Sequence, residues 1–302
     1  MDCVKHRKDT EMKFIIITDS NCDLSSEYLK ENNVPVIPFH FNLNGKDYED
    51  DFGKSMSYMK FYDELRKGKM PTTAQITPSV YEEFFNKYVS EGYSIIYIGF
   101  SSALSESFNH SLIAQKVVMT ENKDANITVI DSKCATVGQG ILVYYACEMK
   151  RQGKSKEEIA AWVEDTKLKV NMLFTVDSLD HLRRGGRLSA ASAVFGTMLH
   201  MKPILFVDNE GKLAPKGRVR GRQKAISTLS QELKNRIINP DKQVVFICHG
   251  DCSKEAEHLK ELIMSNVNVK DVIINCLGPI IGTHTGPGLL VVAFIGNNRL
   301  IE

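Results

Sequence analysis

The run Gly278-Pro-Ile-Ile-Gly-Thr-His-Thr-Gly-Pro-Gly288 is the stretch that the rest of the chain is organised around. Apolar runs lie on both sides of it, Val272–Ile274 before and Leu289–Val292 after, which predicts two buried strands joined by a glycine-rich turn. Glycines allow positive φ and close approach of a ligand, and prolines stiffen a turn. Two interpretations stay open: the turn presents His284 and its threonine neighbours to a small ligand, or it is a tight crossover whose histidine bonds locally.

The first half of the chain repeats one pattern, in which a short apolar strand is followed by a polar turn and a helix. The strands are expected at Phe14–Thr18, Ser94–Ile98 and Ile127–Ile130. This order predicts a parallel sheet between helices, and ligands bind such sheets beyond the carboxyl ends of the strands. Polar pairs stand at those ends, where they serve either a ligand or helix capping: Asp19-Ser20, Ser101-Ser102 and Asp131-Ser132.

The second half has a different order, with a hairpin at Asn209-Glu-Gly211 between two strands and a strand on each side of the histidine turn. This order predicts a mixed sheet covered by helices, in a second α/β domain. We expect a disordered tail over residues 1–12, an N-terminal α/β domain over residues 13–168 and a C-terminal α/β domain over residues 169–302. The chain of 302 residues is long enough for two domains of ordinary size.

Composition excludes several classes of protein. The formal net charge is +1, which gives no global attraction to nucleic acid or to a membrane surface. The longest apolar runs are far shorter than the roughly 20 residues that span a membrane. The seven cysteines include no Cys-x-x-Cys pair, which indicates reduced thiols and a cytoplasmic protein. No integral membrane segment and no signal peptide are expected.

Two kinds of loop suit an anionic ligand. Hydroxyl-rich loops at Thr72–Gln75 and Ser101–Ser105 combine neutral donors with the free amides of the helices that follow. Capping of those helices is the competing explanation. A basic turn, Arg183-Arg-Gly-Gly-Arg187, suits an anionic group or an acidic partner, and a solvated turn explains it equally well. Arg218, Arg220 and Arg222 alternate along an extended segment, so they leave one face of it.

Motifs that would identify an enzyme are absent. The sequence contains no phosphate-binding loop, no Gly-x-Ser-x-Gly nucleophile elbow and no His-Glu-x-x-His zinc motif. His249 and Cys252 lie close together, but two ligands do not make a metal site. We therefore expect no catalytic residue, no metal and no cofactor. The alternative is a stand-alone enzyme, for phosphoryl transfer or hydrolysis, that uses His284 as its general base or phosphoryl relay.

Taken in order, the motifs are similar to those of the DegV family from Phe14 almost to the end of the chain. Each motif is weak alone, and the ordered set is specific. The residues that carry the resemblance are Ile17–Ser20, Thr73–Gln75 with Pro78, Ser101–Ser105, Val129–Ser132 with Gly138–Gly140, Leu182–Arg187, Lys202-Pro203 and Gly278–Gly288.

The resemblance implies a DegV-like protein that holds one long-chain fatty acid, such as palmitate, between two α/β domains. It further implies a non-catalytic subunit of fatty acid kinase, which presents the carboxylate to a separate ATP-dependent kinase subunit for acyl phosphate formation. Carried over by motif, the carboxylate contacts are Thr73, Ser101, Ser102, Arg187 and His284. The residues for docking of the kinase partner are Arg187, Arg220 and His284.

Two departures from the family pattern affect the expected head-group site. Ala74 replaces the usual serine, and Glu106-Ser107-Phe108 stands where Gly-Thr-Tyr is usual. The tail is expected to dominate affinity, because a C16 chain buried at about 0.8 kcal/mol per methylene gains on the order of 10 kcal/mol. A helix of small residues, predicted from Ala190, is expected to line the tunnel for that tail or to pack against the sheet.

Overall fold

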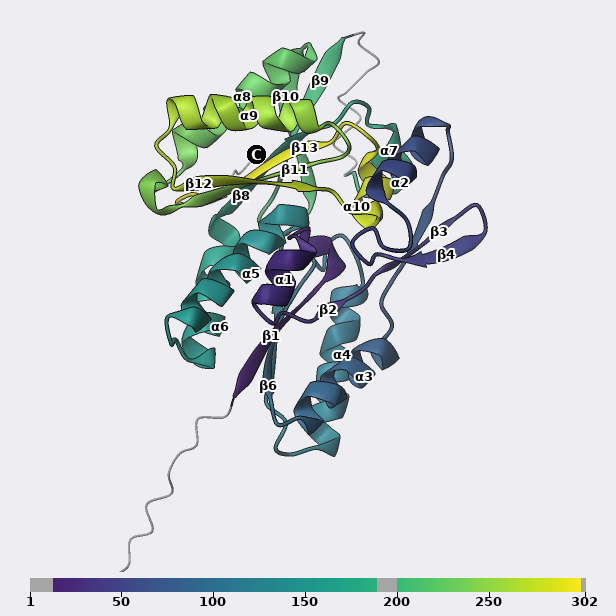
Figure 1. The fold of residues 1–302 in the computed structure, drawn as a ribbon, viewed down its shortest axis with the longest axis vertical. Helices are drawn as coiled ribbons and strands as arrows, with labels where there is room; N and C mark the ends of the chain where they lie inside the picture. Colours follow the sequence, from purple (N-terminus) through teal and green to yellow (C-terminus); the bar gives the residue numbers. More distant parts are fainter. Residues whose placement is uncertain (1–12, 189–199, 300–302) are drawn as a thin grey trace, which may run out of the picture.

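The computed structural model describes residues 13–188 and 200–299. Two large sheets lie one above the other in Figure 1, with helices packed around and between them. The predicted α/β class, with a parallel first sheet and a mixed second sheet, is confirmed. The predicted tail over residues 1–12 and the predicted small-residue helix from Ala190 fall outside the described residues.

The first sheet is parallel throughout, in the order β2-β1-β6-β7. Its central strands are almost wholly apolar and buried on both faces, as parallel strands covered by helices require. Its strands are β1 (Phe14–Asp19), β2 (Val36–Ile37), β6 (Ser94–Gly99) and β7 (Ile127–Asp131). Its helices are α1 (Ser26–Glu31), α3 (Pro78–Ser90), α4 (Ser107–Glu121), α5 (Thr136–Arg151) and α6 (Lys156–Thr166), and short 3-10 turns follow β1 (η1, Ser20–Cys22) and α6 (η2, Lys167–Lys169).

A small antiparallel sheet stands beside the first one and corrects one prediction. The polar stretch after Pro71 is not a loop, because Thr72–Ala74 forms strand β5, which pairs with β3 (His40–Leu43). Asn44-Gly45, a pair typical of tight hairpin turns, joins β3 to β4 (Lys46–Glu49), and both residues have positive φ. Pairing of Phe41 with Thr73 fixes the register, so the threonine is held by a sheet.

The second large sheet is mixed, in the order β10-β9-β8-β13-β11-β12, with only the β11–β12 pair parallel. It shares no strand with the first sheet, since β7 ends at Asp131 and β8 begins at Val170. Its strands are β8 (Val170–Thr175), β9 (Met201–Val207), β10 (Leu213–Arg220), β11 (Val244–His249), β12 (Asp271–Cys276) and β13 (Leu290–Ile295). Its helices are α7 (Asp180–Arg184), α8 (Arg222–Arg236), α9 (Ser253–Asn266) and α10 (Pro279–Thr285), with α2 (Tyr58–Arg66) of the first half beside α10.

Helix α5 joins the two layers, because it packs against β1 and β6 on one side and β8, β11 and β13 on the other. Two glycines allow this close approach. A Cβ on Gly138 would lie 2.2 Å from the sulfur of Met172, and a Cβ on Gly140 would lie 2.6 Å from the carbonyl oxygen of Cys22. One buried apolar cluster accordingly runs from Ile16 in the first sheet to Val291 in the second.

The histidine turn is the second correction, since residues Pro279–Thr285 form the short helix α10. Proline at the first helical position is favourable because its fixed φ suits the helix and no hydrogen bond is lost there. Gly286, with φ of 73°, ends the helix where a residue with a side chain would be strained. The prolines and glycines thus mark the two ends of a helix, which carries His284 in its last turn.

Candidate functional site

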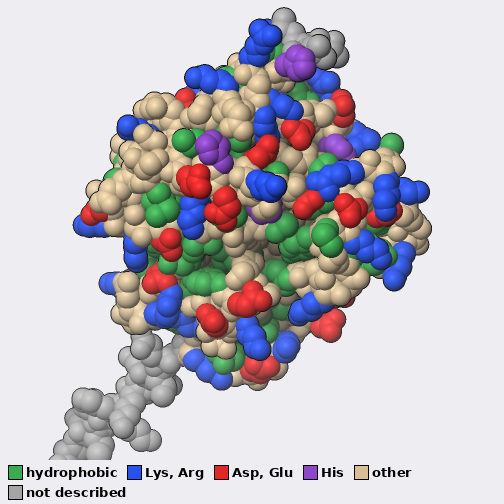
Figure 2. Space-filling view, turned by 45° about the horizontal axis from the view of Figure 1, so that its top comes forward, with side chains coloured by type: hydrophobic (Ala, Val, Ile, Leu, Met, Phe, Trp, Pro, Cys, Tyr) green, Lys and Arg blue, Asp and Glu red, His purple; other side chains and the backbone are tan. Residues whose placement is uncertain are grey.

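A cavity of about 440 Å³ lies between the two large sheets. This volume is within the range of about 300–1,000 Å³ that is usual for small-molecule sites. Figure 2 shows hydrophobic side chains gathered across the middle of one face of the molecule, with Lys and Arg side chains near them. Most of the cavity wall is apolar and comes from both halves, for example from Phe39, Phe100, Phe174, Val207, Leu213 and Val291.

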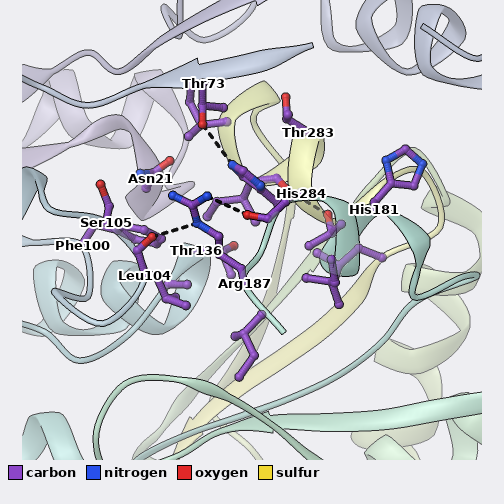
Figure 3. Close-up of a pocket in the computed structure, with 18 of the residues that line it drawn as sticks. Asn21, Thr73, Phe100, Leu104, Ser105, Thr136, His181, Arg187, Thr283 and His284 are labelled. Atoms are coloured by element: carbon purple, nitrogen blue, oxygen red, sulfur yellow. Dashed lines mark hydrogen bonds between the residues drawn. The ribbon is translucent and has the colours of Figure 1, made fainter. Parts of the chain in front are cut away.

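Polar side chains line one region of this cavity, where Thr73 meets His284. Their Oγ1 and Nε2 atoms are 3.0 Å apart, and the two residues come from β5 and α10 (Figure 3). The hypothesis that His284 hydrogen-bonds locally is therefore wrong, because its partner Thr73 is 211 residues away in the chain. Both side chains line the cavity, so the contact is available to a ligand.

Arg187 also lines the cavity and links the two halves of the chain. Its Nε donates to the carbonyl oxygen of Leu104 at 3.2 Å, and its Nη1 donates to the carbonyl oxygen of Gly185 at 2.7 Å. These two bonds fix the guanidinium at the cavity wall, as Figure 3 shows. The structure thus brings together three of the predicted head-group residues, Thr73, Arg187 and His284.

The imidazole of His284 is neutral at physiological pH. Burial, and then the nearby charge of Arg187, lowers its pKa to about 4. Its Nδ1 has no hydrogen-bond partner among the described residues and faces Gly185, where an added Cβ would lie 2.3 Å away. The absence of a side chain at Gly185 is what allows the ring to sit between the basic turn and Thr73.

The other two predicted contacts, Ser101 and Ser102, lie outside the cavity wall. The buried hydroxyl of Ser101 donates to the carbonyl oxygen of Gly211 at 2.9 Å, which ties the first half to the β9–β10 hairpin. The hydroxyl of Ser102 accepts from Nζ of Lys133 at 2.9 Å, and that ammonium also pairs with Asp131. Both serines therefore bond to protein groups in this structure.

The predicted docking residues are also separated. Arg187 and His284 line the cavity, whereas Arg220 is an exposed residue at the end of β10, paired with Met201 of β9, and does not line it. His181 of α7, which the sequence did not single out, lines the cavity, as does Arg184 of the predicted basic turn. Helix α7 (Asp180–Arg184) contains the first two arginines of the predicted basic turn, and His181 lies in the helix just before them.

His249 and Cys252, which lie close together in the sequence, are also close in the structure. The Nδ1 atom of His249 accepts from the backbone N–H of Cys252 at 3.3 Å, so their proximity serves a local turn. Within residues 13–188 and 200–299, no three His, Cys, Asp or Glu side chains are grouped as metal ligands. In the same ranges, no helix combines the length and the apolar character needed to cross a membrane.

Comparison with known protein families and sequences gives a consistent result. A family model described as "Uncharacterised protein, DegV family" matches residues 13–297. A DegV domain-containing protein of Clostridium perfringens is 44% identical over 287 residues, which are 95% of this chain and 99% of the relative. A DegV domain-containing protein of Lactococcus lactis is 34% identical over 281 residues, 93% of this chain and 97% of the relative.

Solved structures with the same fold include three for which a lipid ligand is described. A DegV family protein from Thermus thermophilus, described for its fatty acid binding, is 27% identical, with a TM-score of 0.85 over 94% of this chain and 100% of that one. DegV of Bacillus subtilis, described as a fatty acid binding protein, is 28% identical, with a TM-score of 0.80 over 95% and 100% of the two chains. A stearic acid-binding protein from Eubacterium ventriosum is 27% identical, with a TM-score of 0.83 over 94% and 98%. The family model and the relatives cover the chain from the first strand to the last, and this chain belongs to the DegV family.

Proposed function

We propose that this protein binds one long-chain fatty acid in the cavity between its two large sheets. The observation that carries the proposal is the cavity itself, whose wall is mostly apolar and has Thr73, Arg187 and His284 among its polar residues. Fatty acid binding by DegV proteins of Thermus thermophilus and Bacillus subtilis supports it. The tail lies along the apolar wall, and the carboxylate is held by Thr73, His284 and Arg187.

The two ends of the ligand do different work. Each buried methylene contributes about 0.8 kcal/mol, so a C16 tail supplies on the order of 10 kcal/mol. Each neutral hydrogen bond to the head contributes roughly 1 kcal/mol net, and more where a charge takes part. The tail therefore sets affinity, and the polar residues set the orientation of the ligand.

The neutral histidine has a specific role in this arrangement. If Nε2 of His284 carries the proton, it donates to Oγ1 of Thr73, and the threonine hydroxyl proton is free to point at a carboxylate oxygen. We take this tautomer as the binding-competent one. The predicted contact from Ser101 requires its hydroxyl to leave Gly211, and Ser102 does not line the cavity, so Thr73, His284 and Arg187 are the primary contacts.

Native mass spectrometry of the purified protein tests the proposal directly. The expected result is an added mass of one C14 to C18 fatty acid, which chloroform extraction removes and added palmitate restores. A protein that carries no such mass and takes up no palmitate after delipidation would refute fatty acid binding.

Thr73→Val is expected to weaken palmitate binding by about tenfold or more, because the variant keeps the shape of the side chain and removes a donor to a charged group. Titration of delipidated protein with palmitate in a calorimeter measures the effect. Thr77→Val is the matched control, since Thr77 is an exposed residue before α3 that bonds to Ser79 and does not line the cavity. Equal affinities for all three proteins would remove Thr73 from the head-group site.

Gly185→Ala is expected to weaken palmitate binding about tenfold by displacing His284, since the added Cβ would lie 2.3 Å from Nδ1 of that ring. Gly217→Ala is the control, because a Cβ at Gly217 would meet no atom of the described residues within 4 Å, its two chain neighbours aside. The chemical shifts of the His284 ring report its displacement independently of binding. Unchanged ring shifts and unchanged affinity in Gly185→Ala would contradict the packing described for this histidine.

We further propose that the protein presents the carboxylate to an ATP-dependent kinase partner in the cytoplasm. Support comes from the cavity wall, which includes Met70 and Arg184, both exposed to solvent, so the polar region is reachable from outside. Arg220→Glu is expected to reduce acyl phosphate formation with the partner while leaving palmitate binding unchanged.

A stand-alone role of His284 as general base is not favoured, because a base with a pKa near 4 is poorly matched to neutral pH.

A further inference from the structure

Asn21 is a buried polar residue of the cavity wall. It lies in the 3-10 turn η1 that follows β1, and it is 1% exposed. Among the residues that the structure describes, neither Oδ1 nor Nδ2 has a hydrogen-bond partner. Figure 3 places it on the side of the cavity that Thr73, Phe100 and Ser105 form, near the polar region.

The turn that carries Asn21 is rigidly held, so the side chain has little freedom to find a partner elsewhere. The backbone N–H of Asn21 donates to Oδ1 of Asp19 at 3.1 Å. The other carboxylate oxygen of Asp19 accepts from the hydroxyl of Tyr97 and from the backbone N–H of Phe100, each at 2.9 Å. Asn21 is therefore anchored to a buried network, and it lines the cavity with both amide atoms unpaired among the described residues.

The chemistry of an amide restricts what can satisfy it. Asn21 offers two N–H donors on one atom and an acceptor on the other, and a buried polar group without a partner is costly. A carboxylate has only acceptors, so it can satisfy Nδ2 and not Oδ1. A hydroxyl group both donates and accepts, so a single hydroxyl at this position can satisfy both ends of the amide.

We propose that Asn21 binds a hydroxyl group on the chain of the ligand, close to its carboxyl end, and that hydroxy fatty acids are a preferred ligand class of this protein. The inference rests on the proposed function, because it places the carboxylate at Thr73, His284 and Arg187 and the hydroxyl beside it. Because Asn21 lies near Thr73, Arg187 and His284, it can contact a hydroxyl near the carboxyl end of the ligand and not one near the methyl end. An ordered water on the amide is the competing occupant.

Calorimetric titration of the delipidated full-length protein with three acids tests the proposal: palmitic, 3-hydroxypalmitic and 16-hydroxypalmitic acid. The wild type is expected to bind 3-hydroxypalmitate about tenfold more tightly than palmitate, with no such gain for 16-hydroxypalmitate. Asn21→Leu, which is close in size and apolar, is expected to abolish the preference. Asn275→Leu is the matched control, because Nδ2 of Asn275 is also buried without a partner but does not line the cavity.

The outcomes separate this inference from the function on which it rests. Palmitate binding with no preference for 3-hydroxypalmitate in the wild type, a result that needs no variant, would overturn the role of Asn21 alone and indicate a bound water. A preference that Asn21→Leu retains would overturn it as well. Failure of the wild type to bind any of the acids would overturn the proposed function and the inference together.

Discussion

Replacing Arg299 with methionine is expected to lower the free energy of unfolding by about 3 to 5 kcal/mol, because it leaves a group of buried acceptors without donors. Arg299 is 1% exposed, and its Nε, Nη1 and Nη2 atoms make five hydrogen bonds at 2.6 to 2.9 Å. A guanidinium has five N–H donors, so every one of them is used. The acceptors are the carbonyl oxygens of Lys133, Lys167, Val170 and Asp208 and the sulfur of Cys134.

The size of this effect comes from what Arg299 joins. Its acceptors belong to the loop after β7, the turn η2, the start of β8 and the β9–β10 hairpin, so one side chain connects both large sheets. Methionine keeps the apolar stem and removes all the donors. Arg299→Lys restores the charge and a compact donor but not the planar fork, so its stability is expected to fall between the two.

Chemical denaturation at neutral pH measures the loss. Arg151→Met is the control, because the side chain of Arg151 is 56% exposed and pairs with Glu148 on the surface of α5. Such a pair contributes about 0 to 1 kcal/mol, so the control is expected to unfold close to the wild type. A loss of less than about 1 kcal/mol in Arg299→Met would show that water replaces these bonds easily.

Sequence patterns predicted those parts of the fold that depend on local chemistry. The β-branched run Phe14–Thr18 became a buried parallel strand, and Asn209-Glu-Gly211 became the turn between the antiparallel strands β9 and β10, because each signal acts over a few residues. The helix α10 was missed because Gly-Pro and Thr-Gly-Pro mark turns as well as helix ends. Strand β5 was missed because three polar residues become a strand only when β3 lies beside them.

The site was only partly predictable for the same physical reason. Thr73, Arg187 and His284 carry chemical groups that suit a carboxylate, and the structure brings them to one cavity. The hydroxyls of Ser101 and Ser102 were equally suitable as groups, but their partners Gly211 and Lys133 arrive from elsewhere in the chain. Asn21 could not be singled out because its significance is the lack of a partner, which only packing reveals.

A second long-range feature is the group of buried acids where α10 meets the first half of the chain. Asp23 is 5% exposed, and its Oδ1 accepts from the backbone N–H of Gly278 at 2.8 Å. The carboxylate of Asp50 approaches the same glycine, since a Cβ there would lie 3.1 Å from an oxygen of each aspartate. Burial raises the pKa of Asp23 to about 7, and burial and then the charge of Asp23 raise the pKa of Asp50 well above its usual value.

The contribution of these buried carboxyl groups to the free energy of unfolding is expected to be larger at mildly acidic pH than at mildly basic pH. In the unfolded chain the carboxyl of Asp23 has its ordinary pKa of 3.8, so the folded state binds the proton more tightly. The resulting stability is complete below about pH 3.8 and is lost as the pH rises through about 7. A pKa difference of this size corresponds to about 4 kcal/mol.

Asp23→Asn is therefore expected to raise the free energy of unfolding at pH 8 by about 2 to 4 kcal/mol and to leave it nearly unchanged at pH 4. The asparagine Oδ1 keeps the bond from Gly278, and its Nδ2 gives the Asp50 carboxylate a donor in place of a second charge. Urea denaturation at intervals from pH 4 to pH 8, for the variant and the wild type, measures the difference.

Taking the difference between the two proteins removes the contribution of other groups, and this step is needed because His284 acts in the opposite direction. The pKa of His284 is lowered, so its contribution to stability is lost as the pH falls. Asp241→Asn supplies the control, since Asp241 is exposed whereas Asp23 is buried. If the curves of Asp23→Asn and the wild type ran parallel from pH 4 to pH 8, Asp23 would not titrate in this range. The junction of α10 with the first half would then hold a carboxylate that is charged throughout.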